Sequence, residues 1–395
     1  MAPENSSRTP ADLRASICKL RVLCVGNGGM IGRGGRLWSH RFNGAFLAEM
    51  GGLVKEIVFC NWLDNGDDPL CQTDLGTMSG VRPLGLPPIT GGFLRKGING
   101  LRALAILTRE LARTHFVYLY WPGRLPWIVS GLCRAVGKPY GIYLRGELDL
   151  LSPNFQEAFR HARFVLTTGE TLRRAVESHC SAVENVTPMT SLQPDHILPP
   201  RLPSQSGSWN LLYVGRLEER KGVYDLLEAV SYLEEWHHSF TLTLVGHCLD
   251  PAGLLGQLPP AVAARVRLPG VIADFESLIP FYRAADAFIV PSHDEGFPRV
   301  LYEAMAFGVP ILTTFVGSIP SVMKDADNCL EIKVRNPLDI AAKIRGLMTR
   351  IDLQTALAAS GHRCIAKLMK SWQRSHAMQV AERLGQWVAE AGRRP

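Results

Sequence analysis

The sequence of 395 residues lacks the long apolar run that a membrane-spanning helix needs. Such a helix takes about 20 consecutive apolar residues, whereas the apolar segment LPWIVSGL (125–132) is short and Arg134 soon follows it. The N-terminal stretch MAPENSSRTPADLRAS is polar and contains acidic residues, unlike a signal or transit peptide. We therefore expect a cytoplasmic protein, with peripheral contact at the cytoplasmic face of a membrane as the alternative.

Paired cysteines are lacking too. The nine cysteines are an odd number, and none belongs to a C-x-x-C pair. Cys24 and Cys60 lie inside the apolar runs RVLCVG and IVFCNW, where cysteine behaves as a small buried hydrophobic residue. This usage is typical of a reducing compartment, and we expect no zinc or other metal site.

Acidic residues are scarce in only one half of the chain. The formal net charge is +7, and residues 1–205 contain 23 Lys and Arg against 16 Asp and Glu. Residues 206–395 contain 20 of each. A basic domain attracts anionic lipid headgroups, nucleic acid or an anionic substrate, or it is simply a solvated basic surface. We expect an anionic membrane surface to be the partner of the N-terminal half, and no nucleic acid.

Short apolar runs alternate with longer amphipathic segments along the chain. With 46% hydrophobic and 20% charged residues the composition is globular, and the length suits two domains. In the first half, strands are predicted at 20–26, 54–62, 116–121, 138–146 and 162–168. Between the first two, residues 37–51 have helical periodicity. This alternation predicts a parallel sheet with helices on both faces.

A stretch rich in proline and serine (194–210) is predicted as a linker, after which the pattern restarts. The strands predicted after it are 211–216, 241–247, 266–271, 287–292 and 310–315. We predict a first domain over 1–200, a second doubly wound domain over 206–370, and a terminal helix over 371–395. Ligands bind beyond the carboxyl ends of the strands in such sheets, so the motifs at those ends indicate the function.

The first such motif is GNGGMIGRGG (26–35), predicted to lie between the strand at 20–26 and a helix. Glycines let backbone N–H groups approach a phosphate, and a helix N-terminus adds partial positive charge. Gly26 and Gly28 fit the dinucleotide-binding pattern G-x-G-x-x-G, but Ile31 occupies its third glycine position. The segment is therefore either a phosphate-binding loop or a tight turn.

The second motif is VGRLEERKG (214–222). Gly215 and Arg216 are predicted to end a strand, and Lys221 lies at the start of the following helix. The planar guanidinium of Arg216 and the ammonium group of Lys221 can bind the same diphosphate. The alternative is a pair of solvated cations.

The third motif, PSHDEGFPRVLYEAMAFGVPILTT (291–314), contains two acids eight residues apart. Glu295 is predicted in a loop after a strand, and Pro298 suits the first turn of the next helix, which contains Glu303. A carboxylate accepts two hydrogen bonds from a diol, which makes Glu303 a candidate ribose ligand. Backbone N–H groups near Gly296 and Phe297 suit a phosphate or a sugar hydroxyl. Taken singly, each Glu is as well explained as a surface or capping residue.

Together these motifs resemble the retaining glycosyltransferases of family 4, which have the GT-B architecture. Residues 295–303 resemble the family's E-x7-E signature, and 215–222 resemble its diphosphate-binding segment. Gly34 and Gly35, with the predicted helix after them, resemble a glycine pair that approaches the donor diphosphate. Val271 and Ile272 match the loop near the nucleotide base. The resemblance is close over most of 210–345 and loose in the N-terminal half.

The resemblance implies an α/β GT-B fold of two Rossmann-like, doubly wound domains that face a central cleft. The second domain binds the nucleotide sugar, the first receives the acceptor, and the terminal helix crosses back to the first. It also implies a UDP- or GDP-sugar as substrate, a retained anomeric configuration, and neither cofactor nor metal ion.

The resemblance also assigns roles to single residues. Arg216 and Lys221 neutralise the leaving diphosphate, while Glu295 contacts the donor sugar or its phosphate. Glu303 holds the ribose. The sugar site is lined by Gly296, Phe297 and Pro298.

The sequence departs from the family pattern in the N-terminal half. Many members have a His–Gly pair near the reacting sugar, where this chain has Arg145–Gly146. An arginine does not act as a general base, because it keeps its proton. We expect Arg145 to act electrostatically in catalysis; the alternatives are an inactive site and a salt bridge to Glu147 or Asp149.

The second half departs from the pattern less. In many family members a Glu follows the strand that corresponds to 310–315. This chain has the loop VGSIPSVM there, in which Ser318 and Ser321 are the hydrogen-bonding side chains. Asp325 and Asp327 spell D-x-D, which we interpret as a solvated turn, because it does not end a strand.

The sequence thus predicts transfer of a hexosyl unit from a UDP- or GDP-sugar to a glycan or lipid-linked acceptor, in polysaccharide or glycolipid assembly. The alternative enzymes on this architecture are a sugar-nucleotide epimerase and a phosphorylase. A different class is a non-catalytic partner subunit that binds a nucleotide sugar.

Overall fold

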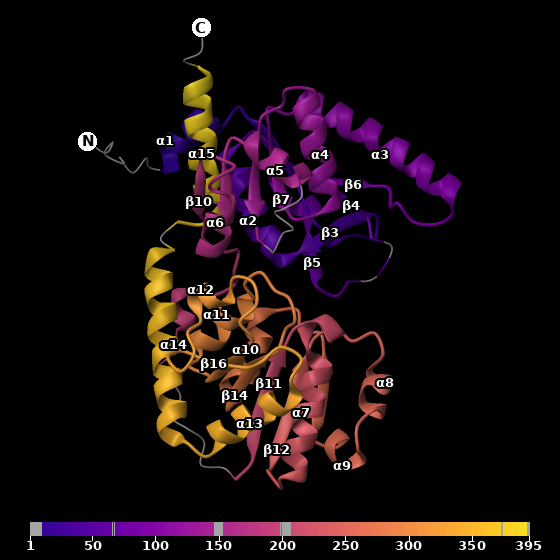
Figure 1. Cartoon of the computed structure of the whole chain (residues 1–395). Coiled ribbons are helices and arrows are strands. Elements are labelled where there is room, and N and C mark those ends of the chain that lie inside the picture. The colour runs from indigo at the N-terminus through magenta and orange to yellow at the C-terminus, as the bar shows by residue number, and fades with distance from the viewer. Residues whose placement is uncertain are drawn as a thin grey trace, which may run out of the picture. The chain divides into compact units, whose positions relative to one another are not determined.

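The computed structural model describes residues 10–64, 66, 68–145, 153–197, 199, 207–372 and 374–392. The chain forms two compact units, shown in Figure 1. The first consists of Met1–Met189 together with Arg374–Pro395, and the second of Thr190–Gln373.

The first unit is built on a seven-stranded parallel sheet, as far as its described residues go. The strands are, in spatial order, β10 (Val183–Asn185), β9 (Val165–Thr167), β8 (Tyr140–Leu144), β7 (Phe116–Trp121), β1 (Arg21–Val25), β4 (Glu56–Trp62) and β6 (Val81–Leu86). Each run predicted as a strand in this half contains one of them, so these predictions are confirmed.

Side chains of this sheet alternate between two cores, as the pleat requires. In β1, Val22 and Cys24 face one core while Leu23 and Val25 face the other. The first core is covered by α1 (Pro10–Ile17), α2 (Arg41–Leu53) and α15 (His376–Ala391). The second is covered by α3 (Phe93–Arg113), α4 (Arg124–Ala135), α5 (Pro153–Arg160) and α6 (Glu170–Val176).

A small antiparallel sheet interrupts the first unit after β1. It consists of β2 (Met30–Arg33), β3 (Arg36–His40) and β5 (Cys71–Asp74). The prediction of a helix over 37–51 is therefore wrong at its start, because α2 begins only at Arg41. Leu37 to Ser39 pair with β2 instead, and His40 pairs with Cys71 of β5.

The second unit has a parallel sheet of six strands among its described residues. Their spatial order is β13 (Val266–Gly270), β12 (Phe240–Val245), β11 (Trp209–Val214), β14 (Ala287–Val290), β15 (Ile311–Thr313) and β16 (Leu330–Glu331). Each run predicted as a strand after the linker overlaps one of the first five, although β11 and β12 begin two residues and one residue before the runs predicted for them.

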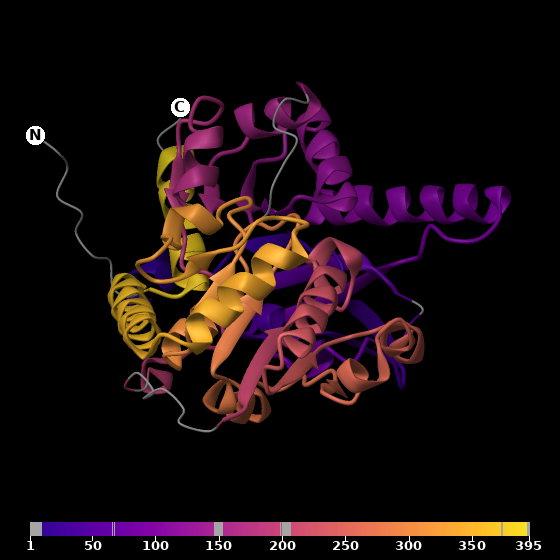
Figure 2. The same ribbon diagram turned by 60° about the horizontal axis from the view of Figure 1, so that its bottom comes forward.

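Helices again cover both faces of this sheet. One face packs against α7 (Val223–Glu235), α8 (Pro251–Gly256), α9 (Pro260–Ala263) and α13 (Pro337–Met348), with α7 and α13 side by side in Figure 2. The other packs against α10 (Phe275–Ala284), α11 (Arg299–Ala306), α12 (Ile319–Val322) and α14 (Ile351–Ser371). Both units are therefore doubly wound α/β layers.

The C-terminal segment is divided between the units. Ser371 ends α14, and the Trp372 ring lies 5.0 Å from that of Tyr302 in the second unit. Ser375 then caps α15 by accepting a hydrogen bond from Met378 N. The apolar side of α15 packs into a core of the first unit.

None of the helices in the described part of the chain is both long and apolar enough to cross a membrane.

Candidate functional site

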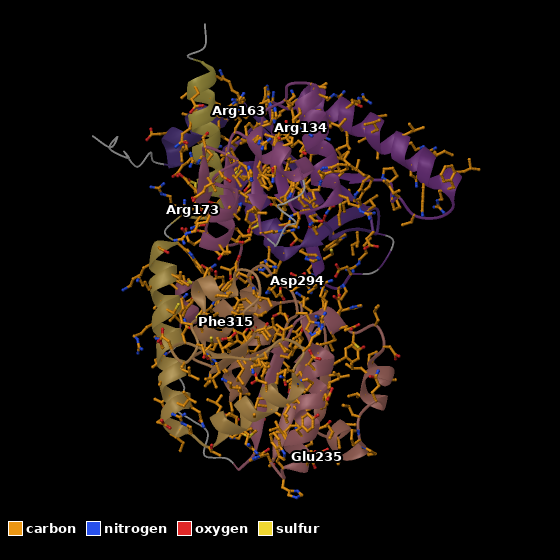
Figure 3. All side chains as sticks on the ribbon, in the orientation of Figure 1. Arg134, Arg163, Arg173, Glu235, Asp294 and Phe315 are labelled. Carbon is orange, nitrogen blue, oxygen red and sulfur yellow. The ribbon has the colours of Figure 1, made fainter. Side chains whose placement is uncertain are left out.

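The two central strands of the second unit define its ligand-binding edge. β11 and β14 are neighbours, and the chain leaves them toward opposite sides of the sheet. Ligands of open α/β sheets bind where the strand order reverses in this way, outside the carboxyl ends. Asp294, which follows β14, lies at this end of the unit in Figure 3, and Glu235, at the end of α7, lies at the opposite end.

The loops after β11 and β14 are joined by hydrogen bonds and ion pairs. The backbone N–H of His293 donates to Arg220 O at 2.9 Å, and Arg220 Nη1 donates to Asp294 Oδ2 at 2.8 Å. Lys221 Nζ forms an ion pair with Glu295 Oε1. The structure therefore brings together the Lys and the first Glu that the sequence assigns to one site, 74 residues apart in the chain.

The Lys221–Glu295 pair is largely shielded from solvent, and the Ser292 hydroxyl also donates to Glu295 Oε1 at 3.2 Å. A further contact, His293 Nε2 to Asp225 Oδ2 at 2.6 Å, ties the loop after β14 to α7. Charge-assisted contacts of this kind fix the loops before a ligand arrives. An incoming anion would meet a positioned ammonium group whose charge Glu295 balances.

Glycines let these loops approach each other closely. Gly222 has φ +69°, and a Cβ there would lie 1.9 Å from Pro291 O, in the loop after β14. Gly246, directly after β12, has φ +150°, and its Cβ would lie 1.7 Å from Gly215 O. Any side chain at either position would push the strand ends apart.

Arg216 lies in the same loop as Lys221 but in a different setting. Its side chain is 52% exposed, and Nη1 donates to Glu218 Oε1 at 2.8 Å. The Tyr213 hydroxyl fixes the backbone here by donating to Arg216 O at 2.8 Å. Arg216 thus has a solvent-exposed guanidinium, paired with Glu218, on an anchored backbone.

Glu303 is buried inside the second unit. It is 3% exposed and lies in α11, which begins directly after Pro298. The Tyr282 hydroxyl donates to Glu303 Oε2 at 2.7 Å. The ribose role of Glu303 stays a prediction.

The remaining predicted donor residues line the same edge. Phe297 stacks on Tyr302 with ring centroids 4.4 Å apart, while Gly296 accepts a hydrogen bond from Ser318 N at 2.9 Å. Val271 and Ile272, both half-buried, directly follow β13.

The loop after β15 contains a buried hydroxyl. Ser318 Oγ has no hydrogen-bond partner among the residues that the structure describes. A buried hydroxyl without a partner is costly, so a polar ligand group at this edge would satisfy it.

Gly34 and Gly35 lie in a different setting from the predicted one. They are the two-residue turn of the β2–β3 hairpin, with φ +58° and +74°. Positive φ at both positions is what a tight hairpin turn requires. The expectation that the pair directly precedes a helix is wrong, because β3 lies between Gly35 and α2.

The corresponding edge of the first unit lies between β1 and β7, where the strand order reverses. Asn27, after β1, donates from Nδ2 to Pro122 O, after β7. Arg145 directly follows the neighbouring strand β8, and its guanidinium carbon lies 5.2 Å from the centroid of the Tyr120 ring, a cation–π geometry. The proposed partners Glu147 and Asp149 lie outside the described residues.

Three metal-ligating side chains gather in the small sheet of the first unit. The ligand atoms of His40, Asp68 and Cys71 lie within 4.8 Å of one another, and His40 Nε2 is 3.0 Å from Asp68 Oδ2. Burial raises the pKa of the Cys71 thiol to about 12, and the charge of Asp68 adds to this. The sequence did not single out this group of three, because its spacing matches no metal-binding motif.

The D-x-D segment forms the turn that the sequence predicts. Ala326, between its two acids, has φ +58°. Asp325 Oδ1 accepts from Glu331 N at 2.8 Å, and Asp327 Oδ1 accepts from Ser360 Oγ at 2.6 Å. Both carboxylates thus have structural partners in an exposed turn.

Comparison with known proteins agrees with this geometry. Residues 209–350 match the family described as glycosyl transferases group 1. Glycogen synthase of Mycobacterium tuberculosis (strain ATCC 25618 / H37Rv) is 32% identical over 145 residues, which are 36% of this chain and 35% of that protein. D-inositol 3-phosphate glycosyltransferase of Geodermatophilus obscurus is 31% identical over 180 residues, 43% of this chain and 39% of that protein. The chain thus matches little more than a third of each relative's length.

Solved structures extend the likeness to both units. The crystal structure of Anabaena HepE in complex with UDP-glucose covers 94% of this chain and 99% of its own, with a TM-score of 0.64 and 16% identity. The fold is GT-B, with two Rossmann-like units, as the sequence predicts.

Sequence reasoning missed several groups that shape the site. Ser292 and the His293–Asp225 pair hold the loop after β14, and Tyr282 holds Glu303. The sequence feature that could have identified Ser292 and His293 is their position directly after the apolar run 287–290, at the carboxyl end of a strand. Tyr282 gave no such signal, since it lies in α10 and reaches Glu303 only through the tertiary fold.

Proposed function

We propose that the chain is a retaining glycosyltransferase of family 4 that moves a hexosyl unit from a UDP- or GDP-sugar to a glycan or lipid-linked acceptor. The main support is the pairing of the loops after β11 and β14 at the switch point of the second unit, with the Lys221–Glu295 pair between them. HepE, a protein of the same fold, has been solved with UDP-glucose.

In the proposed reaction the bond between the anomeric carbon and a diphosphate oxygen breaks. An acceptor hydroxyl oxygen bonds to the same face of that carbon and passes its proton to the leaving diphosphate, so the configuration is retained. Negative charge develops on the leaving diphosphate, and preorganised cations stabilise such charge strongly. Lys221 is held in place for this by Glu295, and Arg216, which is exposed and paired with Glu218, would bind the second phosphate. These cations would do the work of a metal ion, so the reaction is proposed to need neither metal nor cofactor.

The other residues act on the sugar and the acceptor. Glu295, held by Lys221 and Ser292, would accept hydrogen bonds from sugar hydroxyls once an anion engages Lys221. Arg145 is proposed to act as a fixed positive charge from the first unit, because it cannot accept a proton. We propose that the acceptor is assembled into a polysaccharide or glycolipid at the cytoplasmic face of a membrane.

The decisive experiment is nucleotide release from a panel of UDP- and GDP-sugars with and without EDTA. The proposal predicts release that EDTA leaves unchanged, and a product whose anomeric configuration matches the donor's by NMR. Arg145→Ala should abolish release and leave donor binding within about threefold. A strict requirement for a divalent cation would contradict the proposal. Donor binding without turnover on any acceptor would instead support the partner-subunit alternative, which Arg145 in place of His suggests.

A further inference from the structure

Helix α3 of the first unit presents an apolar face to solvent. Phe93 is 92% exposed, Leu94 80% and Leu101 71%, and Ile98 and Leu104 are exposed as well. In Figures 1 and 2 the helix projects from the rest of this unit. Single exposed apolar residues are common, but a contiguous set along one helix indicates an interaction surface.

From Asn99 onward the opposite face of α3 is packed against the rest of the unit. Ala103, Leu107 and Leu111 are buried in a core of the unit, and Asn99 Nδ2 donates to Pro88 O at 2.8 Å. The helix is 21 residues long, so it spans about 30 Å. The helix is therefore anchored to the core through one face, and its other face is an elongated surface open to solvent.

Positive charge borders this face. Arg95, Arg102 and Arg109 lie seven residues apart, which places them along one line of the helix beside the apolar residues. The sequence of α3 contains a single acid, Glu110, whose carboxylate lies on the buried side in an ion pair with Arg82. The exposed side of α3 thus has apolar side chains and cations.

We propose that α3 is a docking surface for an anionic lipid bilayer. The helix would lie in the plane of the interface, with Leu94, Ile98 and Leu101 among the acyl chains near the headgroups. The arginine line would contact lipid phosphates. Interfacial helices have this combination of an apolar face and basic residues, and anionic lipids attract such cations.

The charges distinguish a bilayer from a second copy of the chain. Two α3 helices packed face to face would bring their arginine lines near each other without an acid between them, and like charges oppose such contact. A neutral apolar partner would leave those arginines without anions. An anionic bilayer satisfies both the apolar and the basic parts of the surface.

The test is flotation of the full chain with vesicles of phosphatidylcholine alone or with phosphatidylglycerol, at low and high salt. The variants are Leu94→Gln/Leu101→Gln, which removes apolar contacts, and Arg95→Gln/Arg102→Gln, which removes charge. Leu249→Gln is the matched control, because Leu249 is an equally exposed leucine, at 91%, in the second unit. Circular dichroism and light scattering check folding and oligomeric state.

We expect binding to the anionic vesicles only, weakened by salt, lowered about tenfold or more in either double variant and unchanged in Leu249→Gln. No binding to anionic vesicles at low salt would overturn the inference, as would equal binding by the double variants. Self-association that Leu94→Gln/Leu101→Gln abolishes would assign the face to a second copy instead. The result does not depend on the proposed reaction, since a chain without transferase activity would still bind vesicles.

Discussion

His376 fixes the start of α15 inside the first unit, where burial favours a neutral imidazole that fits its hydrogen bonds. Tyr118 Oη lies 2.8 Å from Nε2, and Thr187 O lies 3.2 Å from Nδ1. A carbonyl oxygen only accepts, so Nδ1 bears the proton and Nε2 accepts from the tyrosine hydroxyl. A second proton on the ring would remove that acceptor.

The pKa of His376 should make this unit sensitive to acid. Burial lowers the pKa to about 3; the Thr187 carbonyl opposes this shift and the positive charge of Arg145 adds to it. In the unfolded chain the pKa is about 6.5. Because the folded pKa is the lower one, the unfolded chain binds the proton first, and stability falls as the pH drops from about 6.5 toward 3. One pKa unit corresponds to about 1.4 kcal/mol, so the loss between pH 7 and pH 5 is about 2 kcal/mol.

Urea unfolding at pH 7 and pH 5, followed by circular dichroism, measures this loss. His376→Gln keeps a polar side chain but cannot titrate, so it should lose about 2 kcal/mol less than the wild type over this interval. His161→Gln, at an exposed histidine of the same unit, should behave as the wild type does. An equal loss in the wild type and His376→Gln would refute the linkage between this imidazole and stability.

Three further predictions concern backbone, hydrogen bonding and thiols. Gly222→Ala should destabilise the chain by more than about 2 kcal/mol in urea, because its Cβ would need φ +69° and would lie 1.9 Å from Pro291 O; an unchanged midpoint would disprove the close approach. Tyr282→Phe removes a buried donor to Glu303 and should cost about 1–3 kcal/mol, seen as a lower Tm; an unaltered Tm would show that this bond contributes nothing. Exposed Cys18 should react rapidly with a thiol reagent in the native chain and half-buried Cys248 and Cys364 more slowly, and reaction of more than three thiols would contradict the burial of the other six.

The buried strands were predictable because both of their faces are covered. β1, β7 and β14 are continuous apolar runs, and a central parallel strand has no other pattern. The edge strands β6 and β10 escaped prediction, since an edge strand tolerates residues such as Pro83 and Glu184 that a central strand excludes.

The site was predictable for residues that follow a strand, because the carboxyl ends of adjacent parallel strands lie together. Lys221 and Glu295 follow strands that are adjacent in the sheet, so the general rule for strand ends brings them together. The hairpin at Gly34–Gly35 was not predicted, because the helical spacing of Phe42, Phe46 and Met50 was extended too far back. Side-chain pairs such as Tyr282–Glu303 depend on packing between elements, which no local pattern encodes.

The most direct test of the proposed donor site is calorimetric titration of UDP and of GDP into the wild type, Lys221→Met and Lys370→Met. A charge-assisted contact to a phosphate contributes about 1.5–3 kcal/mol, so Lys221→Met should bind the preferred nucleotide about tenfold or more weakly. Lys370→Met, at an exposed lysine in the last turn of α14, should bind it as the wild type does. Equal affinity in Lys221→Met and wild type, or binding of neither nucleotide at millimolar concentration, would contradict a diphosphate site between the loops after β11 and β14.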